Sequence, residues 1–257
     1  MVIILYNEKE IKESIISLRK KFTEISKKGY IKGICKGYSS IGRTFEDQLG
    51  LNENEFGIPD YNGIEIKTRR TYSKSAITLF NATPDGDELF EIERLKNTFG
   101  YPCKKDRKYK VLYIEAYGNK LSFAGIKYQY RLEVDREKEK IYLCVYNRDN
   151  ELIEKKVSWS FKYLQERLML KLNYLAVVNV WNKRNDNSEY FKYYKLSFYK
   201  LYSFENFIDL IEAGVIKITI KVDIHTGENN YGKTYDHGCG FSISEGNLTK
   251  LFKKLNY

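Results

Sequence analysis

Two carboxylates and a lysine stand close together in the chain at Asp60, Glu65 and Lys67. Asn62-Gly63 between them is the strongest short signal for a hairpin, because both central residues of a type I′ turn need a positive φ. A reversal there brings Asp60 opposite Glu65, with Cβ atoms about 5 Å apart, a separation at which like charges repel. Alternation along the second strand puts Lys67 on the same face as Glu65. A divalent cation between the carboxylates would turn this repulsion into a metal site.

This set of groups suits the hydrolysis of a phosphodiester. The reaction needs a nucleophilic water and neutralisation of developing negative charge, and a cation held by oxygen ligands supplies both. Mg²⁺ takes one or two carboxylates in such sites, so Asp60 and Glu65 are the predicted ligands, with the backbone carbonyl of Ile66 as a third. Lys67 would hold the attacking water and favour its deprotonated form. The alternative is a solvated hairpin on which Glu65 and Lys67 form only a surface ion pair.

Hydrophobic periodicity predicts a mixed α/β chain around this segment. Asn7 followed by Glu10 marks a helix start, and apolar residues recur at helical spacing until Gly29. We expect further helices at 43–49, 88–98, 161–172, 203–213 and 248–255, and strands at 64–68, 76–81, 109–117, 128–134, 141–146, 152–157, 174–181 and 215–224.

The bulk composition favours a polyanionic partner. The chain has 257 residues, with 44 Lys and Arg against 34 Asp and Glu, a net charge of +10, and such a field attracts nucleic acid. A lysine-rich proteome would give the same balance. The four cysteines are widely spaced and only two histidines occur, so we expect no structural zinc site, reduced cysteines and a cytoplasmic location. No apolar run approaches membrane-spanning length, so no membrane partner is expected.

Four segments around the acidic pair follow one another at 42–51 (GRTFEDQLGL), 52–54 (NEN), 58–60 (IPD) and 63–70 (GIEIKTRR). Their order and spacing resemble the MvaI/BcnI family of restriction endonucleases and the related mismatch-repair nickase MutH. The resemblance implies a restriction-endonuclease-like α/β fold, a mixed sheet flanked by helices with the metal site at one end. Carried over by position, it makes Asp60 and Glu65 metal ligands, Lys67 the catalytic lysine, and Glu46 an additional catalytic acid. Without the resemblance, Glu46 is predicted to be an exposed helix residue beside Phe45 and Leu49, an apolar pair that should face the core.

A later segment, 234–243 (TYDHGCGFSI), resembles the H-D-H-G-T-G-F stretch that contributes to base recognition in the same family. Asp236 and His237 are therefore expected to contact DNA, and Tyr235 replaces the first histidine of the pattern. His237 could donate to or accept from a base edge, and Asp236 could accept from a cytosine amino group. The alternative for His237 is a hydrogen-bonded structural residue. His225 has no comparable support.

Cationic side chains follow the acidic pair directly, at Arg69, Arg70 and Lys74. They are candidate phosphate contacts, which give affinity and position rather than sequence choice, and a solvated edge strand is the competing interpretation. The aromatic and basic run 190–202 could stack unpaired bases, but packing of its rings is favoured. Lys183 and Arg184 could enter a groove from a polar loop.

These observations predict a type II restriction endonuclease that cleaves double-stranded DNA with Mg²⁺, and the resemblance implies that it leaves 5′-phosphate and 3′-hydroxyl ends. The chain is expected to be a single endonuclease domain over 1–257, which could divide into a catalytic core around 30–160 and a β-rich DNA-recognition lobe around 160–245. The resemblance implies a monomer and a cognate DNA methyltransferase that protects host DNA. The alternatives are a MutH-like repair nickase activated by a partner, and a non-catalytic nucleic-acid-binding protein.

Overall fold

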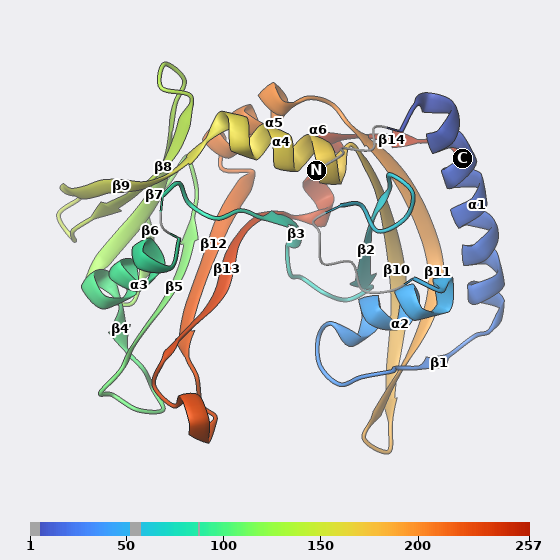
Figure 1. Ribbon diagram of the computed structural model, residues 1–257, viewed down its shortest axis with the longest axis horizontal. Helices are drawn as coiled ribbons and strands as arrows, with labels where there is room; N and C mark the ends of the chain where they lie inside the picture. Colours follow the sequence, from blue (N-terminus) through green and yellow to red (C-terminus); the bar gives the residue numbers. More distant parts are fainter. Residues whose placement is uncertain (1–5, 52–57, 87) are drawn as a thin grey trace. The chain divides into compact units, whose positions relative to one another are not determined.

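The computed structural model describes residues 6–51, 58–86 and 88–257 and groups the chain into two compact units (Figure 1). The first unit comprises Met1–Ser75, Arg167–Tyr202 and Phe252–Tyr257, and the second comprises Ala76–Glu166 and Ser203–Leu251. This grouping differs from the expected lobes around 30–160 and 160–245. The reason is that a strand after residue 173 pairs with the strand of the acidic pair, which leaves 76–166 to the second unit.

A mixed sheet forms the centre of the first unit. Its order is β1 (Ile31–Lys32), β11 (Ser188–Leu201), β10 (Tyr174–Asn185) and β2 (Glu65–Arg70), with β14 (Phe252–Leu255) also pairing with β11. β10 runs parallel to β2, and the other pairings are antiparallel. β2 is therefore an edge strand, with one side of its backbone open to other partners.

Two helices cover this sheet. α1 (Glu8–Lys27) packs against β11, and its start is fixed by the expected capping box between Asn7 and Glu10. α2 (Ser40–Leu49) packs against β2, with Phe45 and Leu49 buried as their spacing predicts. The apolar stripe of α1 is buried in the same core, at Ile11, Ile15, Leu18, Phe22 and Ile25.

Packing accounts for much of the aromatic run 190–202. Phe191, Tyr193 and Phe198 on β11 are buried, and the ring of Tyr194 stacks on Trp181 with centroids 4.4 Å apart. This burial supports the packing interpretation of the run.

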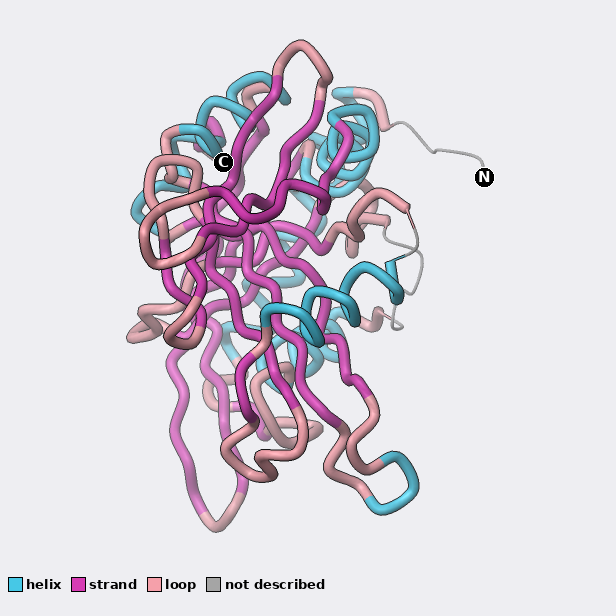
Figure 2. The backbone as a smooth tube through the Cα atoms, turned by 90° about the vertical axis from the view of Figure 1, so that its left-hand side faces the viewer, coloured by secondary structure: helices cyan, strands magenta, loops and turns pink. Residues whose placement is uncertain are grey.

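The second unit is rich in antiparallel strands. One sheet has the order β3 (Ile77–Asn81), β13 (Thr234–Ile243), β12 (Ile216–Ile224), β5 (Lys110–Ala116) and β4 (Tyr101–Pro102). The other is a meander of β6 (Ser122–Ala124), β7 (Tyr128–Asp135), β8 (Lys140–Tyr146) and β9 (Leu152–Ser160). Figure 2 colours the backbone by secondary structure and shows how much of it consists of long, twisted strands.

The remaining elements are helical. They are α3 (Glu88–Phe99), α4 (Phe161–Leu172), α5 (Phe204–Glu212), α6 (Leu248–Leu251), and the short 3-10 turns η1 (Glu228–Asn230) and η2 (Glu245–Asn247). Ser203 caps α5 as expected, by accepting a hydrogen bond from the backbone N–H of Asn206. In the described part of the chain, no helix is long and apolar enough to cross a membrane.

Two expected elements are wrong in extent. The helix expected over 248–255 is only one turn long and continues as β14, because the edge of β11 offers backbone partners from Phe198 to Leu201. The strand expected over 174–181 extends to Asn185 and joins β11 through Asp186 and Asn187, both with positive φ. The sequence pattern did not reveal this turn.

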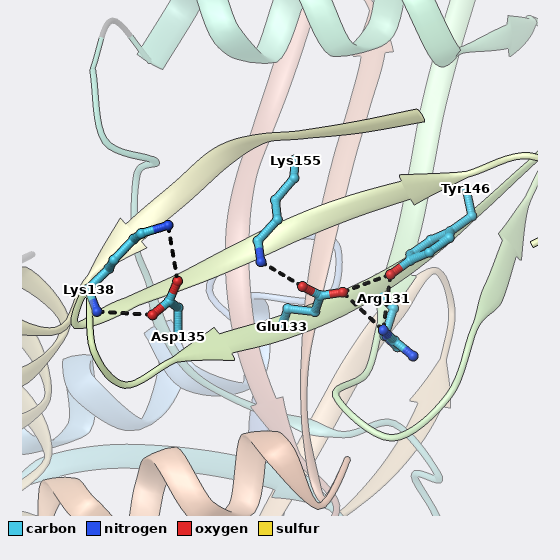
Figure 3. A network of polar contacts seen from close by, with 6 residues as sticks. All are labelled: Arg131, Glu133, Asp135, Lys138, Tyr146 and Lys155. Atoms are coloured by element: carbon cyan, nitrogen blue, oxygen red, sulfur yellow. Dashed lines mark hydrogen bonds and ion pairs between the residues drawn. The ribbon is translucent and has the colours of Figure 1, made fainter. Parts of the chain in front are cut away.

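A polar network ties together one face of the meander (Figure 3). The carboxylate of Glu133 accepts hydrogen bonds from Arg131 (3.0 Å), the Tyr146 hydroxyl (2.8 Å) and Lys155 (2.7 Å). Partial burial favours the neutral acid, but these donors outweigh it and hold the pKa of Glu133 at about 2. Glu133 is therefore an anion that links β7, β8 and β9 across the neutral range.

Candidate active site

The hairpin that carries the acidic pair forms as expected. The backbone N–H and C=O of Tyr61 and Ile64 exchange two hydrogen bonds of 2.9 Å, and φ is 41° at Asn62 and 86° at Gly63. Glycine is needed at position 63 for two reasons: the positive φ, and the space, since a Cβ would lie 2.6 Å from the ring of Tyr6. The turn thus fixes where Asp60 and Glu65 emerge.

Asp60 is locked onto the start of β2. Its Oδ2 accepts a hydrogen bond of 2.8 Å from the backbone N–H of Ile66. The N–H and C=O of one strand residue point to the same side of the strand, so the Ile66 carbonyl also faces the open edge of β2 on the side of Asp60. The side chain of Ile66 projects from the face of the sheet and is buried in the core.

Glu65 is the most unusual group of the site. It is 1 % exposed, and its Oε1 lies 2.7 Å from Nζ of Lys67 and 3.5 Å from Nζ of Lys171. Burial raises the pKa of Glu65 to about 7, opposed by the two lysines and reinforced by the nearby charge of Asp60. Among the described residues, none donates a hydrogen bond to its buried Oε2. A buried oxygen of this kind is costly unless it meets a cation or a donor.

This donor set fits a hard divalent cation. Asp60, Glu65 and the Ile66 carbonyl supply oxygen atoms, and the unsatisfied Oε2 of Glu65 is the direct observation in favour of a ligand. No cluster of three or more His, Cys, Asp or Glu side chains suited to a metal occurs in the chain as described. Two carboxylates with water in the remaining positions is the coordination that Mg²⁺ favours, whereas zinc favours nitrogen and sulfur.

Lys67 occupies the place that alternation predicts, on the same face as Glu65. Lys171, in the last turn of α4, was missed by sequence reasoning. No spacing marks it, because its approach to Glu65 depends on the parallel pairing of β10 with β2. The site thus brings together two carboxyl groups and two lysine side chains.

Glu46 lies half-buried on α2, the helix that packs against β2. A Cβ on Gly42 would lie 3.4 Å from Oγ1 of Thr68 and 3.6 Å from Oε1 of Glu46. This close approach of α2 to β2 puts Glu46 on the helix face beside the strand. Its catalytic role stays a prediction.

The cations after Lys67 differ in their surroundings. Arg69 is buried and donates to the backbone carbonyls of Ser73 and Ser75. Its guanidinium thus supports the following loop, and its role as a direct phosphate contact stays a prediction. Arg70 is half-buried and pairs in bidentate fashion with Glu189, at 3.2 and 3.0 Å. Lys74 is exposed, as a phosphate contact requires.

The tip of the β10–β11 hairpin carries Lys183 and Arg184, the two basic residues expected to enter a groove. Arg184 lines a cleft of about 620 Å³ together with residues 33–37 and 185–189. The ammonium of Lys183 lies over the ring of Tyr30, 4.4 Å from its centroid. Entry of either residue into a DNA groove stays a prediction.

In the second unit, the recognition candidates lie at an irregularity of β13. The β12–β13 register shifts between Ile220 and Val222, so His237 and Gly238 together face Lys221. Gly238 has a φ of +89°, which suits the extra residue of such a bulge. Bulges of this type re-aim a side chain at the surface, and His237 is exposed here.

The rings next to this bulge form a row. The ring of Tyr235 lies 4.3 Å from that of His237 and 4.7 Å from that of His225, and Oδ1 of Asp236 accepts from the Gly238 N–H at 2.8 Å. Partial burial and the Lys221 ammonium hold the pKa of His237 below its usual value. Near pH 7 the neutral ring therefore has one donor and one acceptor nitrogen, as base reading would need.

The chain resembles known proteins in both sequence and structure. The model of the MvaI/BcnI restriction endonuclease family matches residues 19–252. A restriction endonuclease MvaI–cognate DNA substrate complex has 29% sequence identity, a TM-score of 0.87, and covers 95% of this chain and 98% of its own. Restriction endonuclease MvaI in the absence of DNA has 27% identity, a TM-score of 0.62, and covers 98% of each chain. No curated protein sequence matches. The expected restriction-endonuclease-like fold is confirmed.

Proposed function

The chain belongs to the MvaI/BcnI restriction endonuclease family and is a type II, sequence-specific restriction endonuclease, and from this premise we propose that it cleaves double-stranded DNA with Mg²⁺ held by Asp60, Glu65 and the Ile66 carbonyl. The observation that carries the metal assignment is the buried, unsatisfied Oε2 of Glu65 beside Asp60. Mg²⁺, when bound, supplies a nucleophilic water at neutral pH and neutralises charge on the phosphate.

The protein's own groups position this reaction. When Lys67 leaves its contact with Glu65, its ammonium can hold the attacking water. The positive charge of the ammonium favours loss of a proton from this water. Lys171 adds a second positive charge that can offset the negative charge developing on the phosphate. The water oxygen bonds to phosphorus as the bond to the 3′ oxygen breaks. The water proton passes to solvent, and the 3′ oxygen is protonated, leaving 5′-phosphate and 3′-hydroxyl ends.

Binding and sequence choice come from other residues in this proposal. Arg70 ends the catalytic strand and Lys74 follows it, and cations there supply affinity for phosphates whatever the sequence. Asp236 and His237 read base edges, since one offers an acceptor and the other a donor and an acceptor. Glu46 assists at the metal site from α2. We also propose that the protein acts as a monomer in the cytoplasm, and that a DNA methyltransferase protects the host sequence.

Plasmid cleavage by the purified protein tests the proposal. With Mg²⁺, the wild type should give double-strand breaks, and Asp60→Ala or Lys67→Ala should abolish cleavage while DNA binding survives. A matched control is Glu24→Gln on the outer face of α1, which should cleave as wild type. Full activity in the Asp60 or Lys67 variant contradicts the assignment. Nicks without double-strand breaks would favour the repair-nickase alternative.

A further inference from the structure

We propose that the loop 71–75, at the end of the catalytic strand, is a preformed contact for the DNA backbone. In this proposal Tyr72 and Lys74 touch the sugar-phosphate chain, and Arg69 is the positioning residue that holds the loop. The inference rests on the DNA cleavage proposed above, and it assigns a role to a side chain outside the metal site and the recognition bulge.

Arg69 braces the far side of the loop from inside the protein. Its side chain belongs to β2 and is 9 % exposed, and its Nη1 donates to the carbonyl of Ser75 at 2.6 Å. Its Nη2 donates to the carbonyl of Ser73. The N–H of Ser73 in turn bonds to the Arg70 carbonyl at 3.0 Å. A planar guanidinium that binds two carbonyls of one turn fixes both of them.

Thr71 anchors the near side. Its backbone N–H donates to the Val180 carbonyl at 3.0 Å, and its hydroxyl lies 3.1 Å from both that carbonyl and the Tyr194 hydroxyl. Tyr194 is itself stacked on Trp181. The loop is therefore tied to β10 and β11 as well as to its own strand.

This braced loop displays an aromatic ring and a cation to solvent. Tyr72 is 90 % exposed and Lys74 is exposed, so the Tyr72 ring adds little buried surface to the fold. A rigid tyrosine gives contact area at little cost in conformational entropy, and tyrosine hydroxyls and lysines are common donors to phosphates. Because Arg69 is buried and Arg70 is paired with Glu189, Lys74 is the cation among these three that is exposed to solvent.

The distance along the strand suits the same DNA molecule. From Lys67 to Arg70, where β2 ends, the strand advances three residues, about 10 Å at 3.3 Å per residue, and the chain then turns into the loop. The duplex axis rises about 3.4 Å per nucleotide of one strand. The loop can therefore reach phosphates about three nucleotides from the cleaved bond, where binding positions the duplex and carries no information about the sequence.

Salt titration separates the two contacts. With Asp60→Ala as the inactive background, fluorescence anisotropy would measure Kd for a duplex with the mapped site and for a scrambled duplex. Adding Tyr72→Ala should raise Kd about 3- to 10-fold for both duplexes, the loss of about one hydrogen bond, without changing the salt dependence. Adding Lys74→Ala should lower the slope of log Kd against log salt by about 0.9, as expected for one phosphate. Ile16→Ala and Lys20→Ala, both exposed on α1, are the controls and should change neither quantity.

Arg69→Lys tests the positioning role. It should speed hydrogen exchange of the loop amides and weaken binding, but should have no further effect on Kd when Tyr72→Ala and Lys74→Ala are already present. A wild type that cleaves DNA, together with Tyr72 and Lys74 variants that keep its Kd and salt slope, would overturn the loop proposal alone. A wild type that neither binds nor cuts DNA would overturn the proposed function with it.

Discussion

Replacement of Glu65 by glutamine should stabilise the metal-free protein at alkaline pH while removing a ligand for the cation. Glu65 is buried, and burial is the main reason that its pKa rises from 4.5 to about 7. The ammonium groups of Lys67 and Lys171 offset part of this effect, and the charge of Asp60 adds to it. The native fold thus holds a carboxylate where a neutral group would be more stable.

The sign and size follow from proton linkage. Between pH 4.5 and pH 7 the folded protein keeps a proton on Glu65 that the unfolded chain has lost, so stability falls as pH rises through this window. The pKa difference of 7 − 4.5 = 2.5 corresponds to about 3 kcal/mol. Glutamine does not ionise. The free energy of unfolding of Glu65→Gln, relative to wild type, should therefore grow by about 3 kcal/mol between pH 4 and pH 8.

Urea unfolding in EDTA at both pH values measures this difference, and comparison across pH cancels any constant effect of the substitution. Glu24→Gln, at an exposed position of α1, is the control. Addition of Mg²⁺ at 100 times its Kd should stabilise the wild type by about 2.7 kcal/mol at pH 8 and the variant much less. A Glu65→Gln advantage that stays constant from pH 4 to pH 8 would refute the reasoning.

Three further substitutions test other parts of the structure. Lys171→Ala should lower the rate of plasmid cleavage on the order of 10²-fold, and a rate equal to wild type would remove Lys171 from the site. His237→Ala should reduce discrimination by about 1–3 kcal/mol, seen as a smaller ratio of kcat/KM between the mapped site and a one-base variant, whereas an unchanged ratio would exclude base reading. Glu133→Gln should cost about 1 kcal/mol at pH 7, after allowance for the screening of a half-exposed group. The difference in unfolding free energy should shrink as pH falls from 4.5 towards 2, because the Glu133 carboxylate stabilises the fold only while it is ionised. Equal unfolding curves of the variant and the wild type at pH 7 would contradict the network.

Local chemistry explains what the sequence could predict of the site. Asn62 and Gly63 specify a type I′ turn through their own φ values, and strand alternation then places Lys67 beside Glu65. These rules act over a few residues and need no knowledge of the rest of the fold. The capping box of α1 and the Ser203 cap of α5 were predictable for the same reason.

Long-range pairing explains what the sequence could not predict. Lys171 lies just before β10, and it comes near Glu65 because β10 pairs in parallel with β2. In the sequence, the two strands are separated by residues 76–166, which belong to the second unit. Arg69 is buried because the loop after it turns back over its guanidinium, whereas a strand pattern alone leaves it at the surface. The tail at 252–255 became a strand because β11 offered an open edge, although its apolar spacing favours a helix.

Mapping of the ends produced from fully sequenced genomic DNA tests the central claim most directly. Purified protein with Mg²⁺ should produce fragments whose ends share one short recognition sequence and carry 5′-phosphates, and EDTA or Asp60→Ala should abolish them while binding persists. Undiminished cutting by Asp60→Ala, or the absence of any metal-dependent cutting by the wild type, would contradict the assignment of Asp60 and Glu65 as the centre of a DNA-cleaving site.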